Sequence, residues 1–138
     1  MAVNTPQNGS IVVPFLCAAD MSSNEGKIVS IVKDTANTVE LCTAAAGKIK
    51  YMIGVIVDGG TGANTPISVC IAGVCRVQAG AALEFGDYIT SDGDAQGITS
   101  NGDQARVIGQ ALEDGAADGD LFLCRIGVTA LGNAMADG

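Results

Sequence analysis

The chain has 138 residues, of which 48% are hydrophobic but only 4% aromatic, and it contains 19 glycines and no histidine. This share of hydrophobic residues favours one folded domain over a disordered chain. Fifteen acidic against seven basic side chains give a net charge of −8, which argues against nucleic-acid or anionic-membrane partners. The apolar runs are too short to span a membrane and the N-terminus lacks a basic signal flank, so we expect synthesis in a reducing cytoplasm.

Residues 1–10 are polar, show no periodicity and predict an extended N-terminal arm. After the arm, short β-branched segments are separated by turn pairs such as Asn-Gly, Asp-Gly and Gly-Gly. These segments predict strands at Ile11–Cys17, Lys27–Lys33, Thr38–Cys42, Ile53–Val57, Ile67–Ile71, Val74–Gln78, Asp87–Thr90, Arg106–Leu112 and Leu121–Val128.

Hydrophobic residues occupy both faces of Lys27–Lys33, which indicates a strand buried on both sides. Helix formers gather only in Ala79–Phe85, where Gly80 and Gly86 limit any helix to a turn. Many short strands with little helix predict an all-β fold, a small single-domain antiparallel β-barrel or sandwich with short glycine-rich turns. We expect its body at residues 11–128 and a Gly/Ala-rich C-terminal tail at 129–138.

Two segments form an imperfect internal repeat, Ile53–Val74 and Ile108–Val128. Both begin with Ile-Gly, continue through an acidic glycine-rich turn and end on a hydrophobic strand with Gly-Val at its close. Each copy predicts a hairpin, and two hairpins can pair to close one core.

The five cysteines are an odd and scattered set, unlike a disulfide framework, and are expected to be small buried residues: Cys17, Cys42, Cys70, Cys75 and Cys124. If Ala72–Gly73 formed a two-residue turn, Cys70 and Cys75 would face each other across a hairpin. A zinc site would need a second Cys or His pair, which the sequence lacks.

The stretch SDGDAQGITSNGD, residues 91–103, has nearly the spacing of a calcium-binding loop. Oxygen-bearing side chains occupy the five ligand positions, as Asp92, Asp94, Gln96, Ser100 and Asp103. The flanks predict strands rather than helices, and Gln96 and Asp103 are unusual at their positions. We therefore favour a turn between two strands, with calcium binding as the minor hypothesis.

Catalytic patterns are missing from the sequence. Without histidine there is no Ser-His or Cys-His pair, and no phosphate-binding loop or dinucleotide motif is present. The carboxylates fall mostly in turns, which is typical of solvated loop charges. We predict that the protein is not an enzyme and carries no cofactor.

A series of short motifs, in order along residues 11–128, resembles the head-decoration (capsid cement) proteins of tailed bacteriophages. The motifs are Val13-Pro14-Phe15, Ile53-Gly54-Val55, Gly73-Val74 through Ala79-Gly80-Ala81, Gly86-Asp87-Tyr88-Ile89-Thr90-Ser91 and Ile108-Gly109-Gln110-Ala111-Leu112-Glu113.

The resemblance implies a structural virion protein, made in the host cytoplasm, that binds the outside of a phage head. Such proteins commonly form homotrimers at three-fold and quasi-three-fold positions and cement neighbouring major capsid subunits. The arm and the Pro-Phe segment are then the candidate capsid or trimer contacts, namely Val3, Asn4, Thr5, Pro6, Gln7, Asn8, Pro14 and Phe15. The alternative from the residues alone is a small ligand- or ion-binding β module.

Overall fold

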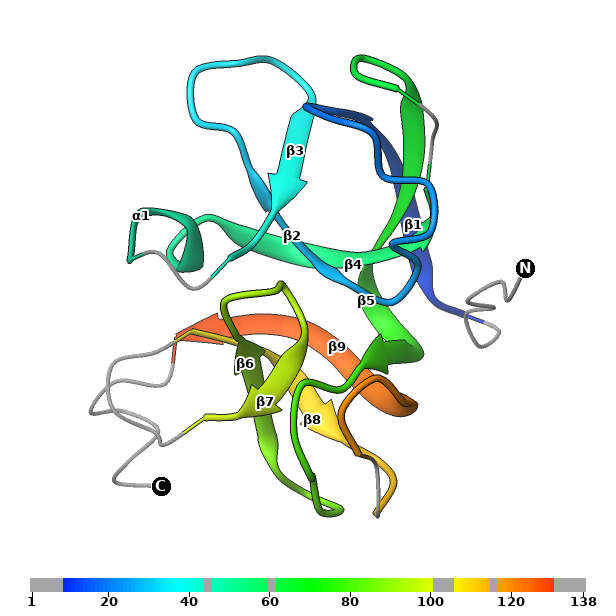
Figure 1. The fold of residues 1–138 in the computed structure, drawn as a ribbon, viewed down its shortest axis with the longest axis vertical. Coiled ribbons are helices and arrows are strands. Elements are labelled where there is room, and N and C mark those ends of the chain that lie inside the picture. Colours follow the sequence, from blue (N-terminus) through cyan, green and yellow to red (C-terminus); the bar gives the residue numbers. More distant parts are fainter. Residues whose placement is uncertain (1–8, 44–45, 60–61, 101–105, 115–116, 131–138) are drawn as a thin grey trace.

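The computed structural model describes residues 9–43, 46–59, 62–100, 106–114 and 117–130 (Figure 1). The fold is nearly all β, as predicted. Its elements are β1 (Ile11–Cys17), β2 (Ile28–Ile31), β3 (Thr38–Leu41), α1 (Ala46–Ile49), β4 (Met52–Asp58), β5 (Pro66–Gln78), β6 (Tyr88–Ser91), β7 (Gly97–Thr99), β8 (Arg106–Ala111) and β9 (Leu121–Ala130).

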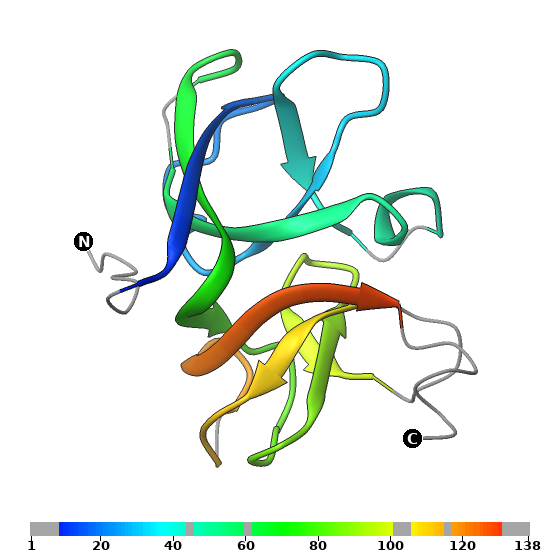
Figure 2. The same ribbon diagram turned by 180° about the vertical axis from the view of Figure 1, so that it is seen from behind.

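The strands pair into two closed rings that share β5. The first ring runs β1–β3–β2–β4–β5, and the antiparallel pairing of β5 with β1 closes it. The second runs β5–β9–β8–β6–β7, and a bridge from Gly97 in β7 to Ala79, just beyond β5, closes it. Figures 1 and 2 show the rings one above the other, with β5 passing from the upper to the lower. All pairs of strands are antiparallel except β1 with β3.

Two hydrophobic cores lie on opposite faces of β2, β4 and β5. Val29 belongs to the core of the first ring, whereas its neighbour Ile28 belongs to the second core. Ile56 and Val55 divide between the two cores in the same way. Both faces of these strands are therefore buried, which confirms the prediction for Lys27–Lys33.

The predicted break at Ala72–Gly73 is wrong, because β5 continues through it from Pro66 to Gln78. Gly73 has a φ of +114°, so the strand bends there instead of turning back. Ser10 occupies the space that a side chain at position 73 would need. Cys75 therefore lies opposite Cys124 in β9, not opposite Cys70.

Two short elements were not predicted. Strand β7 lies inside the acidic stretch 91–103, and helix α1 follows β3. Strand β9 also extends to Ala130, two residues past the predicted end. The described part of the chain contains no helix that is long and apolar enough to cross a membrane.

The two hairpins of the internal repeat are confirmed. Strands β4 and β5 form one antiparallel pair, and β8 and β9 form the other. The hairpins join through their second strands, β5 and β9, over seven residue pairs. The repeat thus supplies one hairpin to each ring.

Candidate functional site

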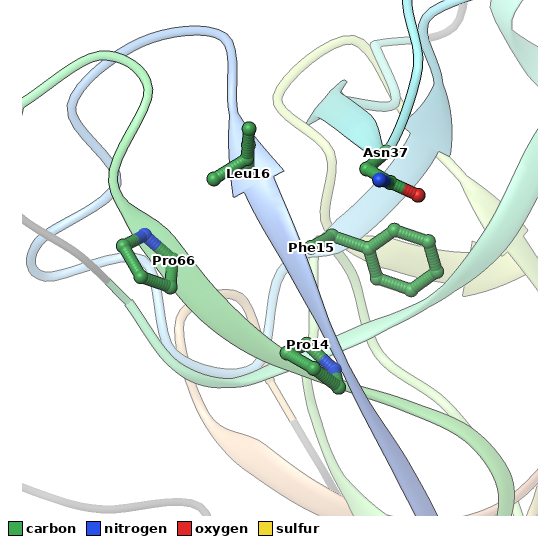
Figure 3. A pocket seen from close by; sticks show the side chains of 5 residues that line it. All are labelled: Pro14, Phe15, Leu16, Asn37 and Pro66. Carbon is green, nitrogen blue, oxygen red and sulfur yellow. The ribbon is translucent and has the colours of Figure 1, made fainter.

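A groove of about 330 Å³ opens beside β1 at the first ring. It is lined by Pro14, Phe15, Leu16, Asn37 and Pro66. Figure 3 shows Pro14 and Leu16 on β1, Pro66 on the neighbouring strand, and Asn37 beside the ring of Phe15. Four of the five side chains are apolar, so the groove suits an apolar or extended partner segment rather than a charged ligand.

The local sequence explains how β1 and its neighbours form the groove. The N–H of Leu16 donates to the carbonyl oxygen of Asn37 at 2.7 Å, and the N–H of Cys17 donates to that of Thr65 at 3.1 Å. Asn37 holds a φ of +56°, a conformation that asparagine tolerates better than most residues. These bonds fix the last residues of β1 between the chain segments that lead into β3 and β5.

No charged side chain lines the groove, and the strand β1 that forms one side of it lies in a stretch of the sequence without charged residues. Asp20 is the first charged residue in the sequence, although the whole chain carries −8. Ile11 and Val12 on β1 are also exposed, by 53% and 39%. An exposed apolar strand without charge is the kind of surface on which two proteins can meet without desolvating ions.

The structure brings together two of the predicted contact residues, Pro14 and Phe15, in this groove. The arm residues Val3, Asn4, Thr5, Pro6, Gln7 and Asn8 lie outside the described residues. Sequence reasoning missed Asn37 and Pro66, because only the parallel pairing of β1 with β3 and the pairing of β1 with β5 place them there.

A second exposed apolar site lies in the other ring. Phe85 is 65% exposed, and Tyr88 at the start of β6 is 38% exposed. The backbone N–H of Phe85 donates to a carboxylate oxygen of Asp114 at 2.6 Å, which fixes the loop. Acidic neighbours such as Asp114 distinguish this site from the uncharged groove.

Residues 92–96 of the acidic stretch form a hairpin turn between β6 and β7. Asp92 Oδ1 accepts hydrogen bonds from the backbone N–H groups of Asp94 at 2.8 Å and Gln96 at 2.9 Å. The side-chain amide of Gln96 donates to Gln78 at 3.1 Å. Asp92 thus stabilises a turn, but this turn joins β6 to β7 inside the stretch and not the two strands predicted on either side of it.

Of the other calcium candidates, Ser100 pairs through its backbone N–H with the carbonyl oxygen of Tyr88. Asp103 lies outside the described residues. Within the described ranges, no cluster of three or more His, Cys, Asp or Glu residues is placed to hold a metal ion.

None of the five cysteines forms a disulfide, and all five are buried. Burial raises the pKa of the Cys42 thiol to about 11 and that of Cys124 to about 12. A hydrogen bond with the Cys75 thiol lowers the pKa of Cys70. The high values are typical of inert, structural cysteines, because the thiolate is the reactive form.

Comparisons with known proteins give one matching family and one similar fold. The family model for phage cement proteins matches residues 7–126. The solved N base of the head fibre protein gp8.5 of bacteriophage phi29 has a similar fold, with a TM-score of 0.60 and 19% sequence identity. The similarity covers 85% of this chain and 93% of that one. No curated protein sequence matches.

Proposed function

Because the chain belongs to the phage cement protein family, we propose that it binds the outer surface of a phage head and cements neighbouring major capsid subunits. It is made in the host cytoplasm and ends as a non-catalytic part of the virion. Its partners are the major capsid protein and two further copies of itself in a trimer at three-fold or quasi-three-fold positions. Several modest contacts per trimer then stabilise the shell strongly, because one trimer bridges several subunits.

The observation that carries this proposal is the uncharged lining of the groove on a chain of net charge −8. Copies of an acidic protein repel one another through most of their surface. Contact through the arm, Pro14 and Phe15 avoids that repulsion. The acidic turns are then left to face solvent on the outside of the head.

The test uses purified protein and expanded heads that lack their decoration. We expect the wild-type chain to co-sediment with the heads and to raise their thermal stability. A charge placed in the groove by Pro66→Asp, at an exposed position, should abolish both effects. The matched control is Phe85→Asp, which adds the same charge at the exposed site of the other ring.

Circular dichroism melting of each variant must show an intact fold before binding is compared. Equal binding by Pro66→Asp and the wild type would overturn the role of the groove. No binding of the wild-type chain to heads of its own phage would overturn the capsid function. Analytical ultracentrifugation tests the trimer separately, since a chain of 13.8 kDa that sediments as a monomer and yet binds heads would overturn the trimer alone.

A further inference from the structure

Strand β1 has one edge that no strand of the described chain covers between Val12 and Pro14. On one side β5 pairs with Ile11–Leu16, whereas on the other side β3 pairs only at Leu16 and Cys17. Figure 2 shows β1 and β3 close together at one end and diverging from there. Uncovered strand edges invite pairing with another extended segment, so this edge is a candidate docking site.

The hydrogen bonds at the end of β1 show which polar groups face this open edge. The N–H of Leu16 points to the β3 side, and the N–H of Cys17 points to the β5 side. Successive residues of a strand direct their N–H and C=O groups to alternate edges. Val12 and Pro14 therefore face the same side as Leu16, so the open edge offers the N–H and C=O of Val12 and the C=O of Pro14.

The residues of β1 suit a strand that is paired on one side and open on the other. Pro14 lacks an N–H only on the open edge, where a proline does not interrupt the pairing with β5. Ile11 and Val12 are exposed by 53% and 39%, so the open part of the strand also presents apolar side chains. The pairing with β5 holds this part of β1 in the extended conformation that a further strand requires.

We propose that this edge binds one extended segment of the major capsid protein, which adds a strand to the first ring beside Val12 and Pro14. The inference rests on the proposed capsid function and adds the mode of contact. Three main-chain hydrogen bonds join the two proteins in this arrangement: one is donated by Val12, and two are accepted by the carbonyl oxygens of Val12 and Pro14. Bonds of this kind supply affinity, whereas side-chain pockets beside the added strand supply specificity.

The groove supplies such a pocket. Pro14 belongs both to the open edge and to the lining of the groove, so a segment paired with Val12 leads directly into it. No charged residue precedes Asp20 in the sequence, and none lines the groove. We therefore expect the capsid segment to be uncharged and largely apolar, because a charge buried there would have no partner.

The same edge of a second copy is a less suitable partner. Pairing of β1 with β1 about a two-fold axis closes a dimer, whereas the proposed assembly is a trimer. Such a pair centred on Val12 would also place the Pro14 of each copy, which has no N–H, at a hydrogen-bonding position. In addition, two chains of net charge −8 repel each other.

Substitution of Val12 by proline tests the proposal, because it removes the N–H that the edge offers. Val12→Pro should leave the fold intact, since this N–H faces away from β5 and β1 already accommodates Pro14 on the same edge. The matched control is Val12→Thr, because threonine is also β-branched and keeps the N–H. Thermal melts verify that both variants fold, and co-sedimentation with undecorated expanded heads measures their affinity.

We expect Val12→Pro to bind the heads about five- to hundredfold more weakly than the wild type, because a carbonyl group of the capsid segment loses its donor. Val12→Thr should bind as the wild type does. Equal affinity of Val12→Pro and the wild-type chain would overturn the added strand and leave the capsid function standing. Failure of the wild-type chain to bind heads would overturn the capsid function, and the inference with it.

Hydrogen exchange identifies the occupant of the edge. The Val12 amide should exchange rapidly in the free wild-type chain and become protected on decorated heads, whereas the Val69 amide in β5 should not change. Protection of Val12 already in the free chain would show that this protein covers its own edge, and would overturn the proposal. So would a smaller sedimentation coefficient of free Val12→Pro than of the wild type and Val12→Thr, since a second copy would then be the occupant.

Discussion

Gly109 in β8 lies directly against the backbone carbonyl group of Arg125 in β9, so a side chain at Gly109 would overlap that oxygen. Gly54 in β4 has the same relationship to the carbonyl group of Cys70 in β5. These are the glycines of the two Ile-Gly steps in the internal repeat. The repeat therefore preserves a close approach of two backbones in each hairpin, and not only a hydrophobic pattern.

The close approach predicts that Gly109→Ala destabilises the fold, although the strand propensity of alanine is no lower than that of glycine. The added methyl group must push β8 away from β9, and overpacking of this kind lowers the free energy of unfolding by about 1–3 kcal/mol. Urea denaturation measures the change. Gly127→Ala in β9 is the control, since a Cβ there meets nothing within 4 Å. Equal stability of the two variants would contradict the close approach.

The raised pKa values of Cys42 and Cys124 predict a loss of stability at alkaline pH. The unfolded thiols have the ordinary pKa of 9.0, whereas burial raises the pKa to about 11 in Cys42 and to about 12 in Cys124. Above pH 9 the unfolded chain therefore binds fewer protons than the folded one, and stability falls as pH rises. Each thiol contributes a slope that approaches about 1.4 kcal/mol per pH unit near pH 10.

Denaturation at pH 9 and at pH 11 measures this slope. Cys124→Ala should reduce the slope of the free energy of unfolding against pH by the contribution of one thiol. This holds whatever the substitution does to the stability at neutral pH. The same slope in Cys124→Ala and the wild type would show that this thiol is not the source. Alkylation of the folded protein gives a second measurement, because buried protonated thiols should resist the reagent.

Deletion of Met1–Gly9 should abolish binding to expanded heads and leave the body folded. Strand pairing of the described chain begins at Ile11, and neither hydrophobic core includes a residue before Cys17 except the partly buried Phe15. Sedimentation with heads and a thermal melt measure the two effects. Deletion of residues 131–138 provides a control of similar length at the other terminus. Full occupancy by the chain without its arm would refute the role of the arm.

The hairpin turn at Asp92 should depend on its carboxylate whether or not calcium is present. Asp92→Ala removes the acceptor of two backbone N–H groups, so we expect it to lower the free energy of unfolding by about 1–3 kcal/mol. Asp94→Ala is the control, because Asp94 is exposed and contributes only its backbone N–H to the turn. A rise of the melting temperature with millimolar calcium that Asp92→Ala removes would revive the calcium hypothesis.

The sequence was informative where short-range patterns decide the structure. The β-branched segments located β1, β4 and β8 closely, and the mixed pattern of Lys27–Lys33 correctly indicated burial on both faces. The break at Ala72–Gly73 was misread because a glycine with positive φ bends a long strand as readily as it ends one.

The groove could not be read from the sequence beyond Pro14 and Phe15. Asn37 and Pro66 are 29 residues apart in number, and their meeting depends on β1 pairing with both β3 and β5. No local pattern encodes such a ring closure. Strand β7 was missed for a related reason, since Gly97–Thr99 is short and gains its partners only from β6 and from Ala79.

Because β5 belongs to both rings, neither ring can open without breaking pairs along a strand that the other ring also uses. Residues Pro66–Cys70 of this strand pair in the first ring, Gly73–Gln78 pair in the second, and Ala72 pairs in both. A pull applied at the groove would pass to the far ring along the backbone of β5, in addition to the side-chain contacts of the core that β2 and β4 share with β8 and β9. The two rings are therefore expected to resist force and to unfold as one mechanical unit, because both depend on β5.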